Sequence, residues 1–206
     1  NGAINWTPTE AQGPSTNVVT VRVSDNGTPI LSATNSLTVV VNEVNTAPVL
    51  TLPANQTINE LTVLNVNATA TDADLPANTL TFALVSGPGG LTVASGGAIN
   101  WPPTEAQGPS TNIVTVRVFD NGTPSLSATN SFTVIVNEVN SAPVLTLPAN
   151  QIINELTALN VSATATDPDI PTNTLTFTLV SGPSGLTVSP SGAINWTPTE
   201  TQGPST

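Results

Sequence analysis

The side chains in this sequence that could do chemistry are carboxylates, and they recur at fixed positions. The chain has 13 acidic residues, and every one falls on one of six positions of an internal repeat. These positions hold Glu10, Glu105 and Glu200; Asp25 and Asp120; Glu43 and Glu138; Glu60 and Glu155; Asp72 and Asp167; and Asp74 and Asp169. Acids that served only solubility would drift between copies, although recent duplication also preserves part of the pattern. The pattern therefore favours a shared role.

Other reactive side chains are missing from the sequence. There is no His, Cys, Met or Tyr, and Arg22 and Arg117 are the two cationic residues. Disulfides and metal sites built on thiolate or imidazole are therefore excluded. The carboxylate pair Asp72 and Asp74 has no such partner for acid–base or nucleophilic catalysis, and a short tandem domain offers no cleft flanked by two carboxyls. We expect no enzyme.

Charge and hydropathy limit the partners further. The formal net charge of −11 lacks the basic surface that nucleic-acid binding needs. No run approaches the ~18 apolar residues of a membrane-spanning helix. Apolar residues make up 38% of the chain, which is enough for a folded core rather than a disordered linker.

The repeat defines the domain organisation. Trp6, Trp101 and Trp196 are spaced by 95 residues, and 77 of 95 positions agree between residues 1–95 and 96–190. A 95-residue unit is about the size of a β-sandwich domain of ~100 residues. The sequence predicts the C-terminal part of a repeat at 1–45, its last three strands. A complete repeat follows at 46–140, and the N-terminal part of a third, its first five strands, at 141–206.

Val, Thr and Leu dominate the complete repeat, with Asn, Pro and Gly between them, a composition typical of strands and turns. We predict strands at 49–53, 61–72, 78–87, 90–93, 97–100, 112–120 and 127–140. Seven short strands indicate an all-β fold of tandem Greek-key sandwiches. Because no Gly/Ser linker separates the units, we expect a rod. In the sixth strand, alternation favours Val114, Val116 and Val118 as core residues.

Alternating strand direction gathers the acids where one domain meets the next. The first predicted junction joins Glu10, Asn42, Glu43 and Asn45 to Asp72, Asp74 and Asp120. The second joins Glu60, Glu105, Asn137, Glu138 and Asn140 to Asp167 and Asp169. Crowded carboxylates without nearby Lys repel one another, and a hard divalent cation removes that cost. Oxygen-only ligands suit calcium, which takes ~6–8 of them, better than magnesium.

These residues resemble the cadherin repeat, and more narrowly the dystroglycan-type cadherin-like (Ig-like) modules of large microbial surface proteins. The segments Asn42–Pro48 (NEVNTAP) and Asn137–Pro143 (NEVNSAP) are similar to the family's calcium-binding linker, Asp-x-Asn-Asp-Asn-Ala-Pro. Asp72-Ala73-Asp74 and Asp167-Pro168-Asp169 resemble its Asp-x-Asp motif. The resemblance implies that Asn78 and Asn173 add further ligands, and it implies an extracellular location at a cell surface.

The chain also departs from this family. Linker aspartates are replaced by Asn at 42, 45, 137 and 140. The family's Asp-Arg-Glu stretch is missing, and Glu105 is the candidate substitute for its Glu. We therefore expect one or two calcium ions per junction rather than three, bound in the ~10⁻⁴–10⁻³ M range. The alternative is that the acids only form turns and keep the surface soluble. Trp101 is interpreted either as a platform that stacks on sugars or as an anchor in the core. Arg117 is interpreted either as a contact for a partner or as an outward-facing residue of its strand.

The sequence thus predicts an extracellular structural or adhesive repeat, a calcium-stiffened stalk or filament segment whose partners are neighbouring repeats. Three alternatives stay open. One is a polysaccharide-binding module, for which an exposed Trp would be diagnostic, and another is a spacer in a secreted protein. The third is a filament subunit that assembles by strand exchange, because 1–45 and 141–206 are incomplete sandwiches with unpaired edges.

Overall fold

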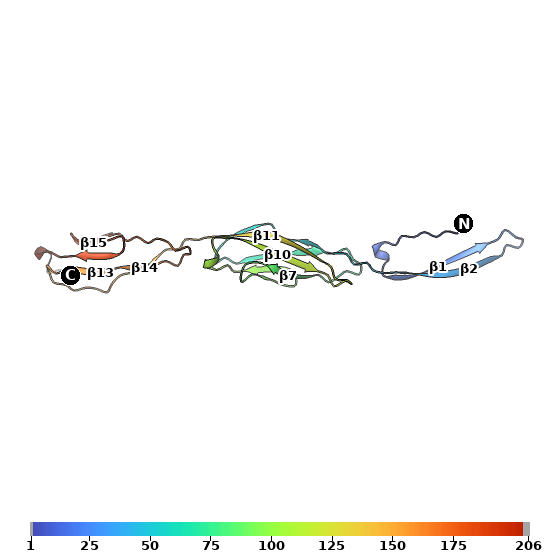
Figure 1. Ribbon diagram of the computed structural model, residues 1–206, viewed down its shortest axis with the longest axis horizontal. Helices are drawn as coiled ribbons and strands as arrows, with labels where there is room; N and C mark the ends of the chain where they lie inside the picture. The colour runs from blue at the N-terminus through green and yellow to red at the C-terminus, as the bar shows by residue number, and fades with distance from the viewer. Residues whose placement is uncertain (1, 204–206) are drawn as a thin grey trace. The chain divides into compact units, whose positions relative to one another are not determined.

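The computed structural model describes residues 2–203 and is all-β (Figure 1). It divides into two compact units. Unit 1 comprises Asn1–Ile58, Thr62–Pro102 and Thr111–Ile135, and unit 2 comprises Asn59–Leu61, Pro103–Ser110 and Val136–Thr206. Three 3-10 turns are the helical elements of the described part: η1 (Glu10–Gln12), η2 (Glu105–Gln107) and η3 (Glu200–Gln202). Among residues 2–203, no helix has the length and apolar character needed to cross a membrane.

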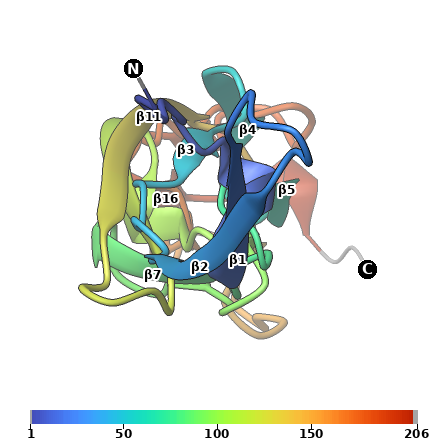
Figure 2. The ribbon, with the colours of Figure 1, turned by 90° about the vertical axis from the view of Figure 1, so that its right-hand side faces the viewer.

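The N-terminal part is dominated by one antiparallel hairpin. Strands β1 (Ser15–Ser24) and β2 (Ser32–Val41) pair along their whole lengths, from Ser15 opposite Val41 to Ser24 opposite Ser32. Figure 2 shows the two strands side by side. The turn between them is closed by Asp25, whose Oδ1 accepts hydrogen bonds from the backbone N–H groups of Gly27 and Leu31.

The central repeat forms a sandwich from three sheets. Its strands are β3 (Val49–Thr51), β4 (Gln56–Asn59), β5 (Leu64–Asn67), β6 (Thr69–Thr71), β7 (Thr81–Ser86), β8 (Thr92–Val93), β9 (Ala98–Trp101), β10 (Ser110–Phe119) and β11 (Ser127–Asn137). The largest sheet has the order β4-β11-β10-β7, and the others are β5-β9-β8 and β3-β6. Every pairing recorded by its Cα partners in the repeat is antiparallel. The expected all-β sandwich is confirmed.

The core of this repeat lies on the faces that alternation predicted. Val114, Val116 and Val118 of β10 are fully buried, whereas Ile113 on the opposite face is 64% exposed. Strand β11 contributes Phe132, Val134 and Val136 in the same way. Trp101 is also fully buried, and its indole N–H donates to the carbonyl of Gly89 at 3.1 Å. Trp101 is therefore a core anchor and not a sugar platform.

Two local features differ from the predictions. The strand expected at 61–72 is wrong as a single element, because β5 and β6 belong to different sheets. The break falls at Ala68, which is buried and donates its N–H to the carbonyl of Gly97. Gly97 has a φ of 94°, and a Cβ there would collide with the Ala68 carbonyl. The second feature is β4, a short strand that was not predicted and that pairs beside β11.

The C-terminal part repeats only some of these elements. Its strands are β12 (Val144–Thr146), β13 (Leu159–Ser162), β14 (Thr164–Thr166), β15 (Thr187–Val188) and β16 (Ala193–Trp196). They form sheets β12-β14 and β13-β16-β15, which reproduce β3-β6 and β5-β9-β8 of the central repeat. The described residues of this part contain no counterpart of the four-stranded sheet.

Candidate metal sites

Carboxylates gather at two places, one inside each compact unit. The first carboxylate cluster consists of Glu10, Glu43 and Asp74, and each of them offers an oxygen within 4.8 Å of the other two. The second carboxylate cluster consists of Glu60, Glu105 and Glu138 and meets the same criterion. The structure thus brings together acids that lie as many as 78 residues apart in the sequence.

The 3-10 turns hold one Glu of each cluster. In η2, Thr104 precedes the turn, and the Gln107 side chain accepts a hydrogen bond from the Thr104 backbone N–H at 2.9 Å. The capped turn holds Glu105 at its start. Oε1 of Glu105 accepts a hydrogen bond from the N–H of Ile170 at 3.3 Å, and so ties the turn to the following repeat. In the first cluster, Glu10 accepts the equivalent bond from Leu75 at 3.1 Å.

Glu60 is the most enclosed member of the second cluster. It is only 3% exposed, and its Oε1 accepts the Val139 N–H at 2.9 Å, whereas its Oε2 is buried and has no hydrogen-bond partner. Its backbone N–H donates to the carbonyl of Asn137. The next residue, Leu61, has a φ of 58°, a strained conformation for Leu. A buried carboxylate oxygen without a donor needs a counter-charge.

Other buried oxygens share this lack of a donor. They are Oε1 of Glu43, Oδ2 of Asp72 and Oε2 of Glu138. Burial raises the pKa of Glu43, and the charges of Glu10 and Asp74 raise it further. Burial likewise raises the pKa of Glu138, together with the charges of Glu60 and Glu105. Each cluster therefore disfavours its own full ionisation.

The Asp-x-Asp pairs have a different environment. Asp74 is 3% exposed and accepts hydrogen bonds from the Thr46 backbone N–H at 3.1 and 3.0 Å and from the Asn78 side chain at 2.8 Å. Oδ1 of Asp72 accepts the Asp74 N–H at 3.0 Å, which leaves the buried Oδ2 of Asp72 free. The second junction repeats these hydrogen bonds with Asp167, Asp169, Ser141 and Asn173.

The predicted ligand Asp120 is saturated by protein donors. Its Oδ1 accepts the N–H groups of Gly122 and Leu126, and its Oδ2 accepts the Asn45 amide at 3.0 Å. Burial acts to raise the pKa of Asp120, but the hydrogen bonds from Leu126, Asn45 and Gly122 outweigh it, so the pKa lies below its ordinary value. Asn45 also donates to the carbonyl of Pro124. At this part of the junction, protein N–H donors stabilise the Asp120 charge.

The remaining predicted Asn ligands fall in two groups. Oδ1 of Asn45 accepts a hydrogen bond from Asn78 at 2.8 Å, and Oδ1 of Asn140 accepts the equivalent bond from Asn173 at 3.0 Å, so these four lie at the junctions. Asn42 is exposed, and the Asn137 amide points to the side chain of Asn59 at 3.4 Å. The metal-ligand role of all these residues stays a prediction.

Two supports of the sites were missed from the sequence. The residue before each Ala-Pro, Thr46 or Ser141, donates its backbone N–H to the second Asp of the Asp-x-Asp pair. Gly108 lies against the Glu60 carboxylate, and a Cβ there would collide with Oε2. The only sequence signal for either was the repetition of these residue types between copies.

Comparison with solved structures decides the fold family. Mouse cadherin-23 EC22-24 matches 95% of this chain and 68% of its own, with 22% identity and a TM-score of 0.55. Human CDH23 EC21-23 matches 81% of this chain and 59% of its own, with 22% identity and a TM-score of 0.51. The chain has the cadherin-repeat fold. The protocadherin GammaB4 extracellular domain also matches, with 22% identity and a TM-score of 0.50, over 93% of this chain and 35% of that one.

The cadherin-like chain therefore spans about a third of that protocadherin domain. No protein-family model matches the sequence, and no curated protein matches it either. Identities near 22% establish the arrangement of strands in these cadherin-like repeats.

Proposed function

We propose that this chain is part of an extracellular structural stalk whose cadherin-like repeats are held together by calcium at their junctions. The observation that carries the proposal is Glu60, a 3% exposed carboxylate whose Oε2 has no donor and which lies within 4.8 Å of Glu105 and Glu138. The extracellular assignment is supported by the likeness to the extracellular domain of protocadherin GammaB4.

The ligand chemistry favours a hard divalent cation. Every candidate ligand is an oxygen, from Glu or Asp carboxylates, and the backbone carbonyls and water that calcium also accepts are available at a junction. With 13 acids and two Arg in the chain, protein cations are too few to neutralise the clusters. The carboxylate oxygens without a hydrogen-bond donor would coordinate a bound calcium. The ion would also relieve the repulsion that contributes to the raised pKa of Glu138.

The mechanical role follows from where the ligands come from. In the first carboxylate cluster, Glu10 and Glu43 belong to one repeat, and Asp74 belongs to the next. An ion shared by these groups would fix the angle between consecutive repeats. We expect one ion, or two, at each junction because Asp120 and Asn45 already satisfy each other.

The test is thermal unfolding of the chain with 10 mM calcium, with 10 mM magnesium and with chelator. For a Kd of ~10⁻⁴–10⁻³ M, ligand linkage predicts about 1.4–2.7 kcal/mol per site, or a Tm higher by about 3–10 °C. Magnesium should give a smaller rise. An unchanged Tm across millimolar calcium would refute the metal sites. Small-angle scattering should in parallel show a narrower distribution of dimensions with calcium than with chelator.

A further inference from the structure

Two leucines have a backbone conformation that leucine rarely adopts. Among residues 2–203, the non-glycine residues with a positive φ are Leu61, at 58°, and Leu156, at 61°. Glycine adopts this left-handed region freely, whereas most residues with a side chain are disfavoured in it. Each leucine directly follows a Glu of the same repeat position, Glu60 or Glu155. The strain therefore recurs beside one kind of acid, and recurrent strain points to a role.

The leucine side chains do not explain this conformation. Leu61 is 70% exposed and Leu156 is 67% exposed, so neither is anchored in a core. The backbone is held instead by hydrogen bonds to two different segments. The Leu61 N–H donates to the carbonyl of Pro103 at 2.9 Å, and the preceding N–H, that of Glu60, donates to the carbonyl of Asn137 at 3.0 Å.

These two hydrogen bonds fix the direction of the Glu60 side chain. They hold the peptide groups on either side of the Glu60 Cα, and the orientation of those two groups sets where its Cβ points. The turn at Leu61 then lets the chain continue from β4 to β5, which belong to different sheets. A left-handed residue after Glu60 is thus the condition for keeping both bonds.

The Glu60 carboxylate has little room to move from this position. Its Oε1 accepts the Val139 N–H at 2.9 Å. On its other side lies Gly108, where an added Cβ would collide with Oε2 and would meet the Glu60 Cβ at 3.2 Å. A rotation of the Glu60 backbone would therefore break contacts of the carboxylate as well as those of the peptide groups.

The copy of this arrangement repeats its main contacts. The Leu156 N–H donates to the Pro198 carbonyl at 2.9 Å, and an added Cβ on Gly203 would collide with Oε2 of Glu155. The left-handed leucine, the proline carbonyl and the close glycine are therefore one local arrangement, which the sequence encodes at both positions.

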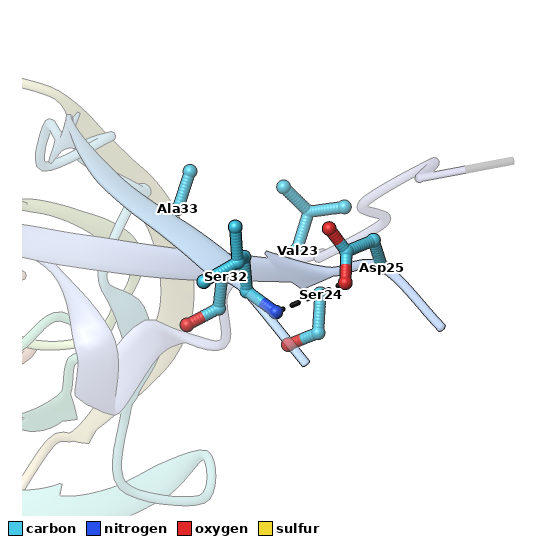
Figure 3. A pocket seen from close by; sticks show the side chains of 6 residues that line it. Val23, Ser24, Asp25, Ser32 and Ala33 are labelled. Atoms are coloured by element: carbon cyan, nitrogen blue, oxygen red, sulfur yellow. Dashed lines mark hydrogen bonds between the residues drawn. The ribbon is translucent and has the colours of Figure 1, made fainter. Parts of the chain in front are cut away.

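Asp25 shows that an acid can be held at a turn without such strain. Figure 3 shows this residue at the end of the β1–β2 hairpin, where its Oδ1 accepts the Leu31 N–H at 2.9 Å and the Gly27 N–H at 3.1 Å. Asp25 thus finds donors within its own turn, whereas the buried Oε2 of Glu60 has none. The strain accompanies the acid that keeps an oxygen available, as a positioned ligand must.

We propose that Leu61 is a positioning residue, whose left-handed backbone holds the Glu60 carboxylate against the other acids of the second carboxylate cluster. The calcium side of this inference rests on the proposed function, but the positioning of Glu60 does not. A residue that disfavours a positive φ should pull the peptide group after Glu60 away from Pro103 and turn the carboxylate out of the cluster. A residue that tolerates a positive φ should leave the cluster intact.

Leu61→Val and Leu61→Gly are the matched pair that tests this. The β-branched Val is a poor residue in the left-handed region, and Gly is the best one. Because position 61 is exposed, neither change removes a core contact. In isothermal titration of the full chain with calcium, Leu61→Val should bind at the second cluster about tenfold or more weakly, whereas Leu61→Gly should bind like the parent chain. Equal affinities of the two variants would overturn the proposal.

Leu156→Val separates positioning from a loss of stability. It places the same disfavoured residue beside Glu155, which is in neither carboxylate cluster of residues 2–203. In chelator, Leu156→Val and Leu61→Val should lower the Tm by similar amounts. In calcium, only Leu61→Val should lose affinity at the second cluster. Similar Tm losses without that difference in affinity would give Leu61 a purely structural role and overturn the proposal.

A double-mutant cycle in chelator tests the positioning without any ion. Glu138→Gln should raise the Tm of the parent chain, because Glu60 and Glu138 place carboxylate oxygens within 4.8 Å of each other. In the Leu61→Val background Glu60 has turned away, so the same substitution should raise the Tm by less. In the Leu61→Gly background the rise should match that of the parent chain.

The cycle also distinguishes this proposal from the proposed function. The same rise in all three backgrounds would overturn the positioning of Glu60, whether or not calcium binds. Rises that differ as expected, in a chain whose Tm calcium leaves unchanged, would support the positioning and refute the calcium sites alone.

Discussion

Glu60 and Glu138 place carboxylate oxygens within 4.8 Å of each other, and each keeps one buried oxygen without a hydrogen-bond donor. In the central repeat they come from distant parts of the sequence, Glu60 directly after β4 and Glu138 directly after β11. Two like charges at this separation are tolerated when a third group neutralises them. The pair is therefore the most direct place to test for a bound cation.

Glu138→Gln should have opposite effects with and without calcium. In chelator, removing one charge relieves repulsion from Glu60 and Glu105, so the Tm should rise by a few degrees. In calcium, loss of a ligand should weaken binding at this junction at least about tenfold, the equivalent of ~1.4 kcal/mol. Isothermal titration and thermal scans measure both effects. Glu200→Gln, at a position outside both clusters, is the control and should change neither; a lower Tm of Glu138→Gln in chelator would contradict the argument.

The pH dependence of stability should change direction when calcium is removed. The folded-state pKa of Glu43 and of Glu138 is raised above the ordinary value of 4.5, so the folded chain binds these protons more tightly than the unfolded chain. In chelator, stability should therefore be greatest below these pKa values and fall as the pH rises through them. In calcium, protonation competes with the ion, and stability should instead fall as the pH is lowered.

A second group of acids sets the lower limit of this window. Hydrogen bonds from Leu31 and Gly27 hold the pKa of Asp25 below its ordinary value of 3.8, and the pKa of Asp120 is also lowered. Their contribution is present above 3.8 and is lost as the pH falls through the folded-state pKa. Thermal scans from pH 3 to 8 should show a maximum near about pH 4–6 in chelator. A chelator Tm that falls steadily from pH 8 to pH 5 would refute the repulsion.

The sequence predicted the fold where alternation was strong. Val114, Val116 and Val118 are buried as expected, because a strand with a hydrophobic and a polar face has one register that buries the apolar side. Strand β4 was missed, since four residues with the single apolar side chain Ile58 are too few to show a strand pattern, and the strand depends on its pairing with β11. The bend at Ala68 depends on its contact with Gly97 and was equally hidden.

Strand direction predicted which acids lie close together but not how each is hydrogen-bonded, and their role as metal ligands stays a prediction. Strand direction predicted that Glu10 and Glu43 of one domain meet Asp74 of the next, and the structure has these three side chains together. The same argument could not separate acids with a free oxygen from Asp120, whose oxygens are all occupied by donors. That difference depends on the geometry of the turn after Asp120 and on the side chain of Asn45, which lies 75 residues away in the sequence. The spacing of the acids along the sequence does not reveal it.

Gly108→Ala should weaken the second junction selectively. The φ of Gly108 is −107°, which Ala adopts without strain, but a Cβ there would collide with Oε2 of Glu60. The displaced carboxylate should lower calcium affinity by about tenfold or more. Gly13→Ala is the matched control, because the equivalent Cβ meets the Val41 side chain at 3.3 Å instead of a carboxylate. Titration should then show one weakened site in Gly108→Ala and none in Gly13→Ala; equal titrations would mean that Glu60 is no ligand.

Asn45→Asp tests whether a carboxylate in place of the Asn45 amide would let the junction bind a further ion. The Asn45 amide donates to Asp120 at 3.0 Å and to the Pro124 carbonyl at 3.0 Å, so the substitution removes two donors and sets a carboxylate against a carboxylate. In chelator the Tm should fall by several degrees, and the pKa of Asp120 should rise. In calcium much of the loss should be recovered, with one more ion bound per chain, as counted by titration. Asn140→Asp is the control, since Asn140 donates only to the neighbouring Ser141 carbonyl among the described residues. A Tm loss for Asn45→Asp that calcium leaves unchanged would show that the amide bridge is purely structural.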